Sequence, residues 1–250
     1  MKRFEGKNIV VTGAAAGIGQ ATALRIAEEG GNVALLDLNA EGLAKTKESA
    51  EAFGAKAWVY ECNVTDGAGV KKVIDQAAAD MGGIHTLTHC AGILRVYATH
   101  EMTFEQWHEI INVNLNGTFY VNHACLPHLL ANKYSTIVNT ASTAALGSHP
   151  WMSAYAASKG GVVSFTRALY QEYVKQGLRA NCVIPGGIST ALQQSFQAPE
   201  GADMDLIRGA MPFVGFGKPK NAASVIAFLA SDDARYINGT EVRADGGALS

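Results

Sequence analysis

The feature that most constrains this chain is a regular alternation between short apolar runs and longer stretches of helical periodicity. Seven candidate strands lie at residues 9–12, 33–37, 57–62, 86–90, 136–140, 179–184 and 241–244. Several of them are near-continuous apolar runs, which are typical of strands buried on both faces of a parallel sheet. Helical stretches lie between them at residues 18–29, 43–53, 70–81, 104–131, 154–176 and 222–230. This alternation predicts an α/β fold: a doubly wound parallel sheet of seven strands flanked by helices. No repeat or linker divides residues 1–250, which predicts a single domain.

Composition and charge exclude several classes of partner. Of the 250 residues, 48% are hydrophobic and 17% are charged, which is ample for a buried core. The balance of 20 basic against 22 acidic residues gives a net charge of −2, and a near-neutral chain without a polybasic run is not expected to bind nucleic acid or a membrane. The chain opens without an apolar signal segment, and its four cysteines form no C-x-x-C pair, so we expect a reduced, cytoplasmic protein.

One proline-rich segment interrupts the alternation. Four of the six prolines, Pro185, Pro199, Pro212 and Pro219, fall between the sixth strand and the last helix. Proline restricts its own backbone and that of the preceding residue, so we expect residues 186–217 to be a loop with at most short helices. A long loop after the carboxyl end of a parallel strand is typical of a substrate-binding lid; a surface loop without function is the alternative.

A glycine-rich turn joins the first strand to the first helix. Gly13 permits the tight turn, whereas Gly17 and Gly19 allow close approach of a ligand and close packing of the helix on the sheet. The amide groups and positive dipole end of the helix N-terminus would face a pyrophosphate. The spacing G-x-x-x-G-x-G is weak evidence for a dinucleotide site when it is taken alone.

Asp37 strengthens that hypothesis, because it ends the second strand at the position where an acid receives the ribose hydroxyls of a dinucleotide. A carboxylate there repels a 2′-phosphate by roughly 4 kcal/mol at about 4 Å and an effective dielectric near 20. No Lys or Arg stands at positions 14–16 or 38–39 to neutralise such a phosphate. The sequence therefore predicts NAD(H) rather than NADP(H) as cofactor.

A tyrosine and a lysine are spaced four residues apart at the start of a predicted helix. Tyr155 and Lys159 would share one face of that helix, so the phenol and the ammonium can meet in one pocket. A free tyrosine has a pKa of about 10 and is a poor base near neutrality, but a neighbouring cation favours the phenolate. The pair is thus a candidate for proton transfer at an alcohol oxygen. Without other evidence, a surface Tyr/Lys pair is the simpler interpretation.

Together these motifs resemble the short-chain dehydrogenase/reductase family from about residue 5 to residue 248. The matching elements follow the family's order and spacing: T-G-x-x-x-G-x-G at residues 12–19, N-x-x-G at Asn114 and Gly117, the preceding serine at Ser142, Y-x-x-x-K at Tyr155 and Lys159, P-G at Pro185 and Gly186, and D-G-G at residues 245–247. The resemblance implies a Rossmann-type fold and a homotetramer, or a homodimer, that pairs the long helices.

The resemblance also implies roles for individual residues. Tyr155 would be the general acid/base, Lys159 would lower its pKa and bind the nicotinamide ribose, and Ser142 would orient the substrate oxygen. Asn114 would hold a proton-relay water through its backbone carbonyl. The residues expected to contact the cofactor are Gly13, Ala16, Gly17, Ile18, Gly19, Asp37, Leu38, Asn63, Val64, Cys90, Ala91, Gly92, Tyr155, Lys159, Pro185, Gly186, Ile188 and Thr190.

The sequence departs from the family pattern at two places. The usual N-N-A-G after the fourth strand is His89-Cys90-Ala91-Gly92, and a thiol makes only weak hydrogen bonds. The usual acid of the adenine pocket is Asn63, which can accept a hydrogen bond without its being charge-assisted. His85 and His89 would lie roughly 13 Å apart on a strand, which is too far for one ion, so we predict no catalytic metal.

The predicted function is hydride transfer between NAD(H) and a small-molecule secondary alcohol or ketone. The substrate-binding residues expected in the loops around the catalytic group are Ser142, Ala144, Leu146, His149, Trp151, Tyr155, Gln193 and Phe196, and most are apolar. Alternatives are an NADH-dependent reductase of a 3-oxoacyl thioester and a non-catalytic NAD-binding sensor. A Ser142/Lys159 hydrolase would leave the glycine-rich turn and Asp37 unexplained.

Overall fold

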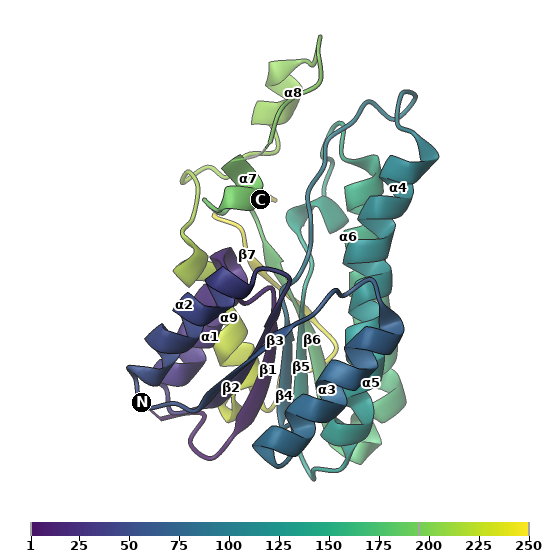
Figure 1. Ribbon diagram of the computed structural model, residues 1–250. Helices are drawn as coiled ribbons and strands as arrows, with labels where there is room; N and C mark the ends of the chain where they lie inside the picture. The colour runs from purple at the N-terminus through teal and green to yellow at the C-terminus, as the bar shows by residue number, and fades with distance from the viewer. Residues whose placement is uncertain (1, 195, 250) are drawn as a thin grey trace.

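The computed structural model describes residues 2–194 and 196–249 and contains one parallel sheet (Figure 1). The strand order is β3-β2-β1-β4-β5-β6-β7, and the strands are β1 (Asn8–Thr12), β2 (Asn32–Asp37), β3 (Ala57–Glu61), β4 (Thr86–His89), β5 (Ser135–Thr140), β6 (Leu178–Pro185) and β7 (Glu241–Ala244). The chain winds outward from β1 to β3, returns to β4 beside β1, and then winds outward to β7. The predicted doubly wound seven-stranded sheet is thereby confirmed, and the switch point between β1 and β4 is where ligands bind in such folds.

Helices cover both faces of the sheet (Figure 1). One face carries α1 (Gly17–Glu28), α2 (Ala40–Glu51) and α9 (Pro219–Ala230); the other carries α3 (Gly67–Met81), α4 (Phe104–Ile111), α5 (Gly117–Leu130) and α6 (Ser153–Tyr173). Two short helices, α7 (Ala191–Gln194) and α8 (Met204–Arg208), belong to the proline-rich segment. The remaining short elements are the π-helix η1 (Asn112–Asn116) and the 3₁₀ helices η2 (Thr143–Ala145), η3 (Val174–Gln176) and η4 (Asp232–Ala234).

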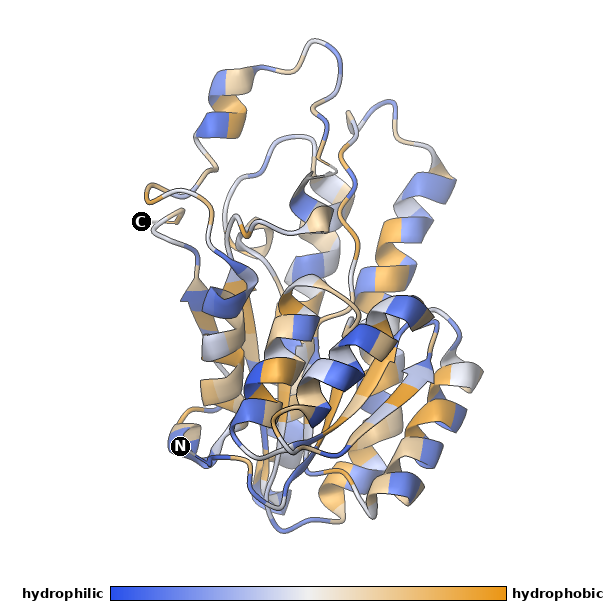
Figure 2. Ribbon diagram, turned by 60° about the vertical axis from the view of Figure 1, so that its left-hand side comes forward, coloured by the Kyte–Doolittle hydropathy of each residue, from blue (hydrophilic) through white to orange (hydrophobic). Residues whose placement is uncertain are grey.

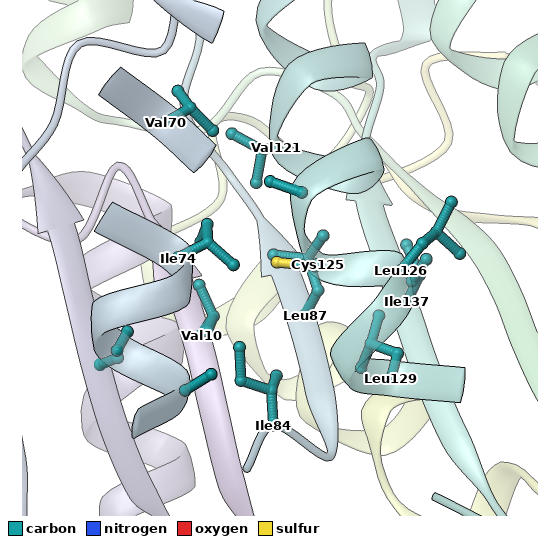
Figure 3. Close-up of a cluster of buried hydrophobic side chains, with 14 of the residues drawn as sticks. Val10, Val70, Ile74, Ile84, Leu87, Val121, Cys125, Leu126, Leu129 and Ile137 are labelled. Carbon is teal, nitrogen blue, oxygen red and sulfur yellow. The ribbon is translucent and has the colours of Figure 1, made fainter. Parts of the chain in front are cut away.

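The central strands β1, β4 and β5 are buried along their whole length, as their apolar runs predict, whereas the edge strands β3 and β7 are only partly buried. Val10 packs toward α3 and α5, whereas its neighbours Ile9 and Val11 pack toward α1 and α9, because successive strand side chains point to opposite faces. Figure 3 shows the cluster that contains Val10, in which Leu87 of β4 lies between side chains of α3 and α5. The outward faces of the helices are largely hydrophilic (Figure 2). Two packed layers therefore hold the sheet rigidly beneath its carboxyl edge.

The stretch at residues 104–131, expected as one helix, is interrupted in the structure. It begins as α4 with a capping box between Thr103 and Gln106, continues through η1, and ends as α5. A π-helical turn inserts one extra residue into the helix without changing its apolar composition, so the hydrophobic pattern cannot reveal it. Asn114 lies in this π-helix, where the helix passes the carboxyl edge of the sheet.

The proline-rich segment begins and ends in ordered structure. Pro185 is the last residue of β6, and Pro219 opens α9, where its fixed φ suits the first helical turn. A short parallel bridge joins Ile188 to Gly217 across the base of the segment. Residues 188 and 217 therefore close a loop that leaves the body of the domain, and Figure 1 shows α8 projecting at the same end of the molecule as α4.

Candidate active site

A cleft of about 200 Å³ opens at the carboxyl edge of the sheet, between the turns after the central strands and the proline-rich segment. Its walls are mainly apolar. The predicted site residues that line it are Ile18, Cys90, Gly92, Ser142, His149, Tyr155, Lys159, Pro185, Gly186, Ile188, Thr190, Gln193 and Phe196. The structure thus brings together residues from the whole length of the chain, as expected at the switch point of a doubly wound sheet.

The glycine-rich turn is closely packed at Gly13 and Gly19, where an added Cβ would lie within 3 Å of backbone atoms. Gly13 and Gly17 have positive φ angles of 66° and 58°, a region that glycine adopts without strain. A Cβ on Gly19 would overlap the Gly13 carbonyl oxygen. Ala16 is the N-cap of α1 and offers no side-chain hydrogen bond, so the first amides of α1 are open to an anion. This cradle fits the pyrophosphate of a dinucleotide.

Asp37 is held beside this turn by two backbone amides. Its carboxylate accepts hydrogen bonds from Ala15 N at 3.1 Å and from Asn39 N at 3.0 Å. The Asn39 side chain in turn caps α2 through Gly42 N at 3.0 Å. Leu38, the neighbouring predicted contact, is 61% exposed. The acid therefore occupies a defined place at the carboxyl end of β2.

The turn after β4, residues 90–92, is enclosed on two sides. A Cβ on Gly13 would lie 2.9 Å from Ala91 N, and a Cβ on Gly92 would lie 3.2 Å from Lys159 Nζ. Thr12 Oγ1 accepts hydrogen bonds from Cys90 N at 3.1 Å and Ala91 N at 3.2 Å. This turn is therefore wedged between the glycine-rich turn and the amine of Lys159.

Tyr155, Lys159 and Ser142 converge on the cleft. Lys159 Nζ donates to the Thr140 carbonyl at 2.9 Å and lies 5.9 Å from the centre of the Tyr155 ring. The Ser142 side chain lies beside the Tyr155 phenol and lowers its pKa, and the Ser142 hydroxyl accepts from Ala144 N at 3.2 Å. Both members of the Tyr–Lys pair thus share one face of α6 and one cavity.

Burial acts on both ionisable groups in the direction that favours their neutral forms. Removal from water raises the pKa of Tyr155, which the hydrogen bond from Ser142 opposes. Removal from water lowers the pKa of Lys159 to about 8. The protein alone therefore holds a neutral phenol, and an additional positive charge in the cleft would favour its ionisation.

Asn114 is fully buried behind this group. Its side chain bonds the backbone of Ile93 in both directions, with the amide oxygen accepting at 2.8 Å and the amide nitrogen donating at 3.0 Å, and the nitrogen also donates to Ser158 Oγ at 3.1 Å. Its backbone carbonyl accepts from Thr118 Oγ1 at 2.6 Å. Asn114 thereby ties the π-helix to the strand-β4 loop and to α6.

At the adenine side of the predicted site, Asn63 already has hydrogen-bond partners within its own turn. The side-chain oxygen of Asn63 accepts hydrogen bonds from Thr65 N at 3.0 Å and Thr65 Oγ1 at 2.9 Å. Val64 is buried, and a Cβ on Gly117 would lie 2.9 Å from its side chain. Asn63 thus shapes its own turn through the atom that would meet an adenine amine.

Comparison with known proteins agrees with this geometry. A family model described as enoyl-(acyl carrier protein) reductase matches residues 13–248. The chain is 38% identical over 247 residues to the 3-oxoacyl-(acyl-carrier-protein) reductase of Thermotoga maritima, covering 99% of both chains. The chain belongs to the short-chain dehydrogenase/reductase family.

Other members of the family extend the comparison. The cyclohexanol dehydrogenase of an Acinetobacter strain is 37% identical over 249 residues, covering 99% of this chain and 97% of the relative. A short-chain dehydrogenase of Burkholderia cenocepacia in complex with NADP superposes with a TM-score of 0.90 at 32% identity, over 99% of this chain and 100% of that chain. Carveol dehydrogenase of Mycobacterium avium in complex with NAD superposes with a TM-score of 0.91 at 25% identity, over 100% and 99%.

These relatives establish the reaction class. The protein is a nucleotide-dependent oxidoreductase that transfers hydride and acts on CH–OH groups of small molecules. In the part of the chain that the structure describes, no helix is long and apolar enough to span a bilayer. Within residues 2–194 and 196–249, no group of three His, Cys, Asp or Glu side chains is placed to hold a metal ion.

Three predicted substrate contacts of this dehydrogenase/reductase lie away from the cleft wall. Ala144 is buried behind Ser142, and Leu146 lines a shallow depression with Leu249. Trp151 adopts a positive φ of 59°, and its carbonyl accepts from Tyr97 N at 2.9 Å. Trp151 thus joins two loops through its backbone.

Several residues of the site were not predicted. Thr12 and Thr140 act through a hydroxyl and a backbone carbonyl that no local pattern singles out. Further lining residues come from the proline-rich segment and from the loop before α6: Met152, Ile207, Ala210, Pro212 and Phe216. Their apolar character was the available signal, but the side that each residue presents depends on how the segment folds back over the cleft.

Proposed function

We propose that this protein is an NAD(H)-dependent dehydrogenase/reductase of an uncharged secondary alcohol or its ketone, with Tyr155 as the acid/base. The observation that carries the proposal is the convergence of Tyr155, Lys159 and Ser142 beside the glycine-rich cradle. Hydride is supplied or accepted by the nicotinamide when the dinucleotide is bound. The protein contributes position and proton transfer.

Each residue of the group has a separate task in the proposal. Tyr155 takes the hydroxyl proton during oxidation and returns it during reduction, within hydrogen-bond reach of Ser142, which orients the same oxygen. Lys159 stabilises the phenolate by its charge and, when the cofactor is present, would bind the nicotinamide ribose. Asn114 keeps the π-helix in place through its side chain, and its backbone carbonyl would hold a relay water.

The cofactor assignment rests on Asp37. Its carboxylate is fixed at the carboxyl end of β2 by Ala15 N and Asn39 N, and a fixed negative charge disfavours a 2′-phosphate. Structures of relatives hold either NAD or NADP, so the choice depends on such local charges. Asp37→Ala should raise kcat/KM for NADP(H) at least about tenfold and lower it for NAD(H). Unchanged preference in this variant would contradict the assignment.

The remaining proposed cofactor contacts follow the same wall. The first turn of α1, including Ala16, Gly17 and Ile18, would face the pyrophosphate, and Gly186, Ile188 and Thr190 would face the nicotinamide. Thr190 lies directly opposite Gly17: a Cβ on Gly17 would approach the Thr190 side chain to 3.3 Å. The cradle and the start of the proline-rich segment therefore meet across the cleft.

The substrate class follows from the polar groups that the cleft offers. Lys159 is the only Lys, Arg, Asp or Glu side chain among the described residues that line it. His149 uses both ring nitrogens locally, with Nδ1 3.2 Å from the Gly147 carbonyl and Nε2 3.2 Å from Thr143 Oγ1. Arg95 is engaged with Glu109 at 3.2 Å and with a neighbouring carbonyl. Among the described residues, a carboxylate or phosphate on the substrate would thus find no cation beyond Lys159.

Residues 186–217 would supply the outer wall for this substrate. Gln193, Phe196, Ile207 and Met211 line the cleft from the proline-rich segment. Gln193 is the one amide among these four, so it is placed to meet a second polar group of the substrate. We therefore assign the segment as the substrate-binding lid.

A reductase of 3-oxoacyl thioesters is the second candidate, favoured by the relative that is 38% identical. The two candidates differ in substrate size and share one catalytic group. The discriminating experiment is a matched panel: NAD(H) and NADP(H) against short and cyclic alcohols and ketones, and against a 3-oxoacyl thioester. The proposal expects higher kcat/KM for an uncharged alcohol–ketone pair with NAD(H). A strong preference for the thioester would select the second candidate, and inactivity on all of them would reject both.

The exposed faces of α4 and α5 support a further part of the proposal, association into a homotetramer or homodimer. Apolar residues of α5 and α6 such as Val121, Leu126 and Leu169 are buried inside the subunit. Phe104 and Phe119 remain 80% and 46% exposed. Light scattering should therefore give a mass of two or four chains, against 26.3 kDa for a monomer.

The cysteines support a cytoplasmic location in the same proposal. Cys62, Cys90, Cys125 and Cys182 are all free thiols, and burial raises the pKa of each. Buried thiols without disulfide partners suit a reducing compartment. Cell fractionation would test this location.

A further inference from the structure

A histidine that has no role in the mechanism above lies beneath the cleft. His89 ends β4 and is 1% exposed. In the parallel sheet it lies between Thr12 of β1 and Asn139 of β5. Its Nδ1 is 2.9 Å from Thr12 Oγ1. It stands at the position of the first asparagine of the family pattern, so an imidazole at this place is a departure from that pattern.

The hydrogen bonds around Thr12 determine where the proton on His89 lies. A hydroxyl oxygen has two lone pairs and one proton. Both lone pairs of Thr12 Oγ1 are occupied, because it accepts from Cys90 N at 3.1 Å and from Ala91 N at 3.2 Å. Its proton must then point at His89 Nδ1, which accepts it. A neutral imidazole with an accepting Nδ1 carries its proton on Nε2.

The other ring nitrogen of His89, Nε2, is in an unusual environment. Within the described chain, His89 Nε2 is buried and has no hydrogen-bond partner. A buried donor without an acceptor is unfavourable, and such a group in a native protein calls for an explanation. Burial and the nearby charge of Lys159 both lower the pKa of His89. The ring is therefore kept neutral, and only its Nδ1 is used.

The turn that Thr12 holds has little freedom. Residues 90–92 lie between two walls: a Cβ on Gly13 would lie 2.9 Å from Ala91 N, and a Cβ on Gly92 would lie 3.1 Å from Asn114 Oδ1 and 3.2 Å from Lys159 Nζ. A shift of a few tenths of an ångström in this turn would move the cradle or the lysine. The orientation of the Thr12 hydroxyl is thus connected to both halves of the cleft.

We infer that His89 is a positioning residue: it accepts the Thr12 hydroxyl proton and so keeps the Thr12 oxygen directed at the backbone amides of Cys90 and Ala91. Those two hydrogen bonds hold residues 90–92 against the dinucleotide cradle. This role rests on the proposed function in one respect, namely that a dinucleotide binds at the glycine-rich turn. His89 itself touches neither cofactor nor substrate. Its effect passes through one hydroxyl group, which makes the role testable by a mutant cycle.

The first experiment compares His89→Leu, Thr12→Val and the double variant by titrating NADH fluorescence. Thr12→Val removes the acceptor for both amides, and we expect the Kd of NADH to rise about tenfold. His89→Leu should raise it about fivefold, and the double variant should bind no more weakly than Thr12→Val alone, because both act through one oxygen. His89→Asn, whose amide oxygen can accept the same proton, should recover the Kd to within about twofold.

A matched control is available on the same strand. Thr88 is equally buried, donates to the Val10 carbonyl at 3.4 Å and faces the opposite side of the sheet. Thr88→Val removes a buried hydroxyl one residue away and should leave the Kd within about twofold. Multiplicative effects of His89→Leu and Thr12→Val, or an unchanged Kd in His89→Leu, would overturn the inference.

The second experiment needs no cofactor. A two-bond ¹⁵N–¹H correlation spectrum of the imidazoles distinguishes the tautomers, with His89→Asn used to assign the signal. We expect His89 to be neutral with its proton on Nε2 at neutral pH. A proton on Nδ1, or a charged ring, would refute the role even if NADH binds. Failure of the unmodified protein to bind NADH would instead reject the cofactor proposal, and the tautomer would still decide the role of His89.

Discussion

The two walls of the cleft are built on different principles. The inner wall, residues 13–19, 90–92 and 155–159, is formed by backbone and buried polar groups in close contact, and a methyl group on Gly19 would overlap a carbonyl oxygen. The outer wall, residues 187–216, is pinned at its base by the bridge between Ile188 and Gly217. Beyond that base, Phe213 and Val214 are 83% and 81% exposed.

This difference follows the two proposed tasks of the cleft: the inner wall holds the cofactor and the acid/base, and the outer wall contacts the substrate. In the proposed function the inner wall must fit the dinucleotide and one proton transfer, so its tolerance to change should be small. The outer wall need only present apolar surface of a suitable shape, and its packing on the domain is correspondingly light. The expected mutational effects therefore fall steeply from the inner wall to the outer wall.

The largest effect is expected at the acid/base. Tyr155→Phe removes the phenolic proton while keeping the ring, and kcat should fall about 10³-fold because positioned proton transfer contributes about 10²–10⁴. Binding of NADH should change little. Stopped-flow or steady-state absorbance of NADH measures the loss. Tyr173→Phe makes the same change at the end of the same helix and should retain activity; substantial activity in Tyr155→Phe would remove Tyr155 from the mechanism.

The next effect tests the close packing of the inner wall. Gly19→Ala places a methyl group against the Gly13 carbonyl oxygen, and overpacking of this kind costs about 2–3 kcal/mol. Gly160, within α6, has open space where a Cβ would lie, so Gly160→Ala should stabilise the fold by about 0.5–1 kcal/mol. Urea unfolding measures both free energies. Equal effects at the two glycines would show that the cradle is not under steric constraint.

The same contrast explains how far the sequence could be interpreted. The strand ends were predicted to within one residue, and for the central strands this is because burial on both faces leaves an apolar run. The convergence of the inner-wall residues was also predictable, since Gly13 belongs to a turn of fixed spacing and Tyr155 and Lys159 stand four residues apart on one helix. Thr12 was not identified as a hydrogen-bond centre, because its partners come from β4.

The residues that line the outer part of the cleft and the π-helix could not be predicted from local sequence patterns. Leu146 and Trp151 were expected in the cleft because they are apolar and close to Ser142, but neither lines it, and Leu146 lines a separate depression. The π-helix at Asn114 was taken for continuous α-helix, since both have the same apolar pattern. Long-range backbone geometry decided these features, and local composition does not encode it.

A smaller effect follows from the neutral state of His89. Burial lowers its pKa to about 3, from about 6.5 in an unfolded chain. Between these values the unfolded state binds a proton that the native state does not, so the free energy of unfolding falls as pH decreases through this window. Relative to His89→Asn, the wild-type protein should lose about 1 kcal/mol per pH unit below pH ~6.5. Urea unfolding at a series of pH values measures the difference, and parallel curves would show that the buried ring titrates normally.

The smallest effects are expected on the outer wall, where lining and exposed residues should behave differently. Met211 lines the cleft, whereas Phe213, two residues away, is 83% exposed. Met211→Ala removes apolar contact with the substrate, so KM for an apolar alcohol should rise about three- to tenfold with little change in kcat, at about 0.8 kcal/mol for each methylene group. Phe213→Ala removes a larger side chain but should leave KM within about twofold and stability within about 0.5 kcal/mol. Steady-state kinetics of the two variants, measured on the same alcohol, decide whether the outer wall acts through its lining residues alone. A larger effect at Phe213 would mean that the segment closes further over the substrate and that the exposed ring becomes part of the wall.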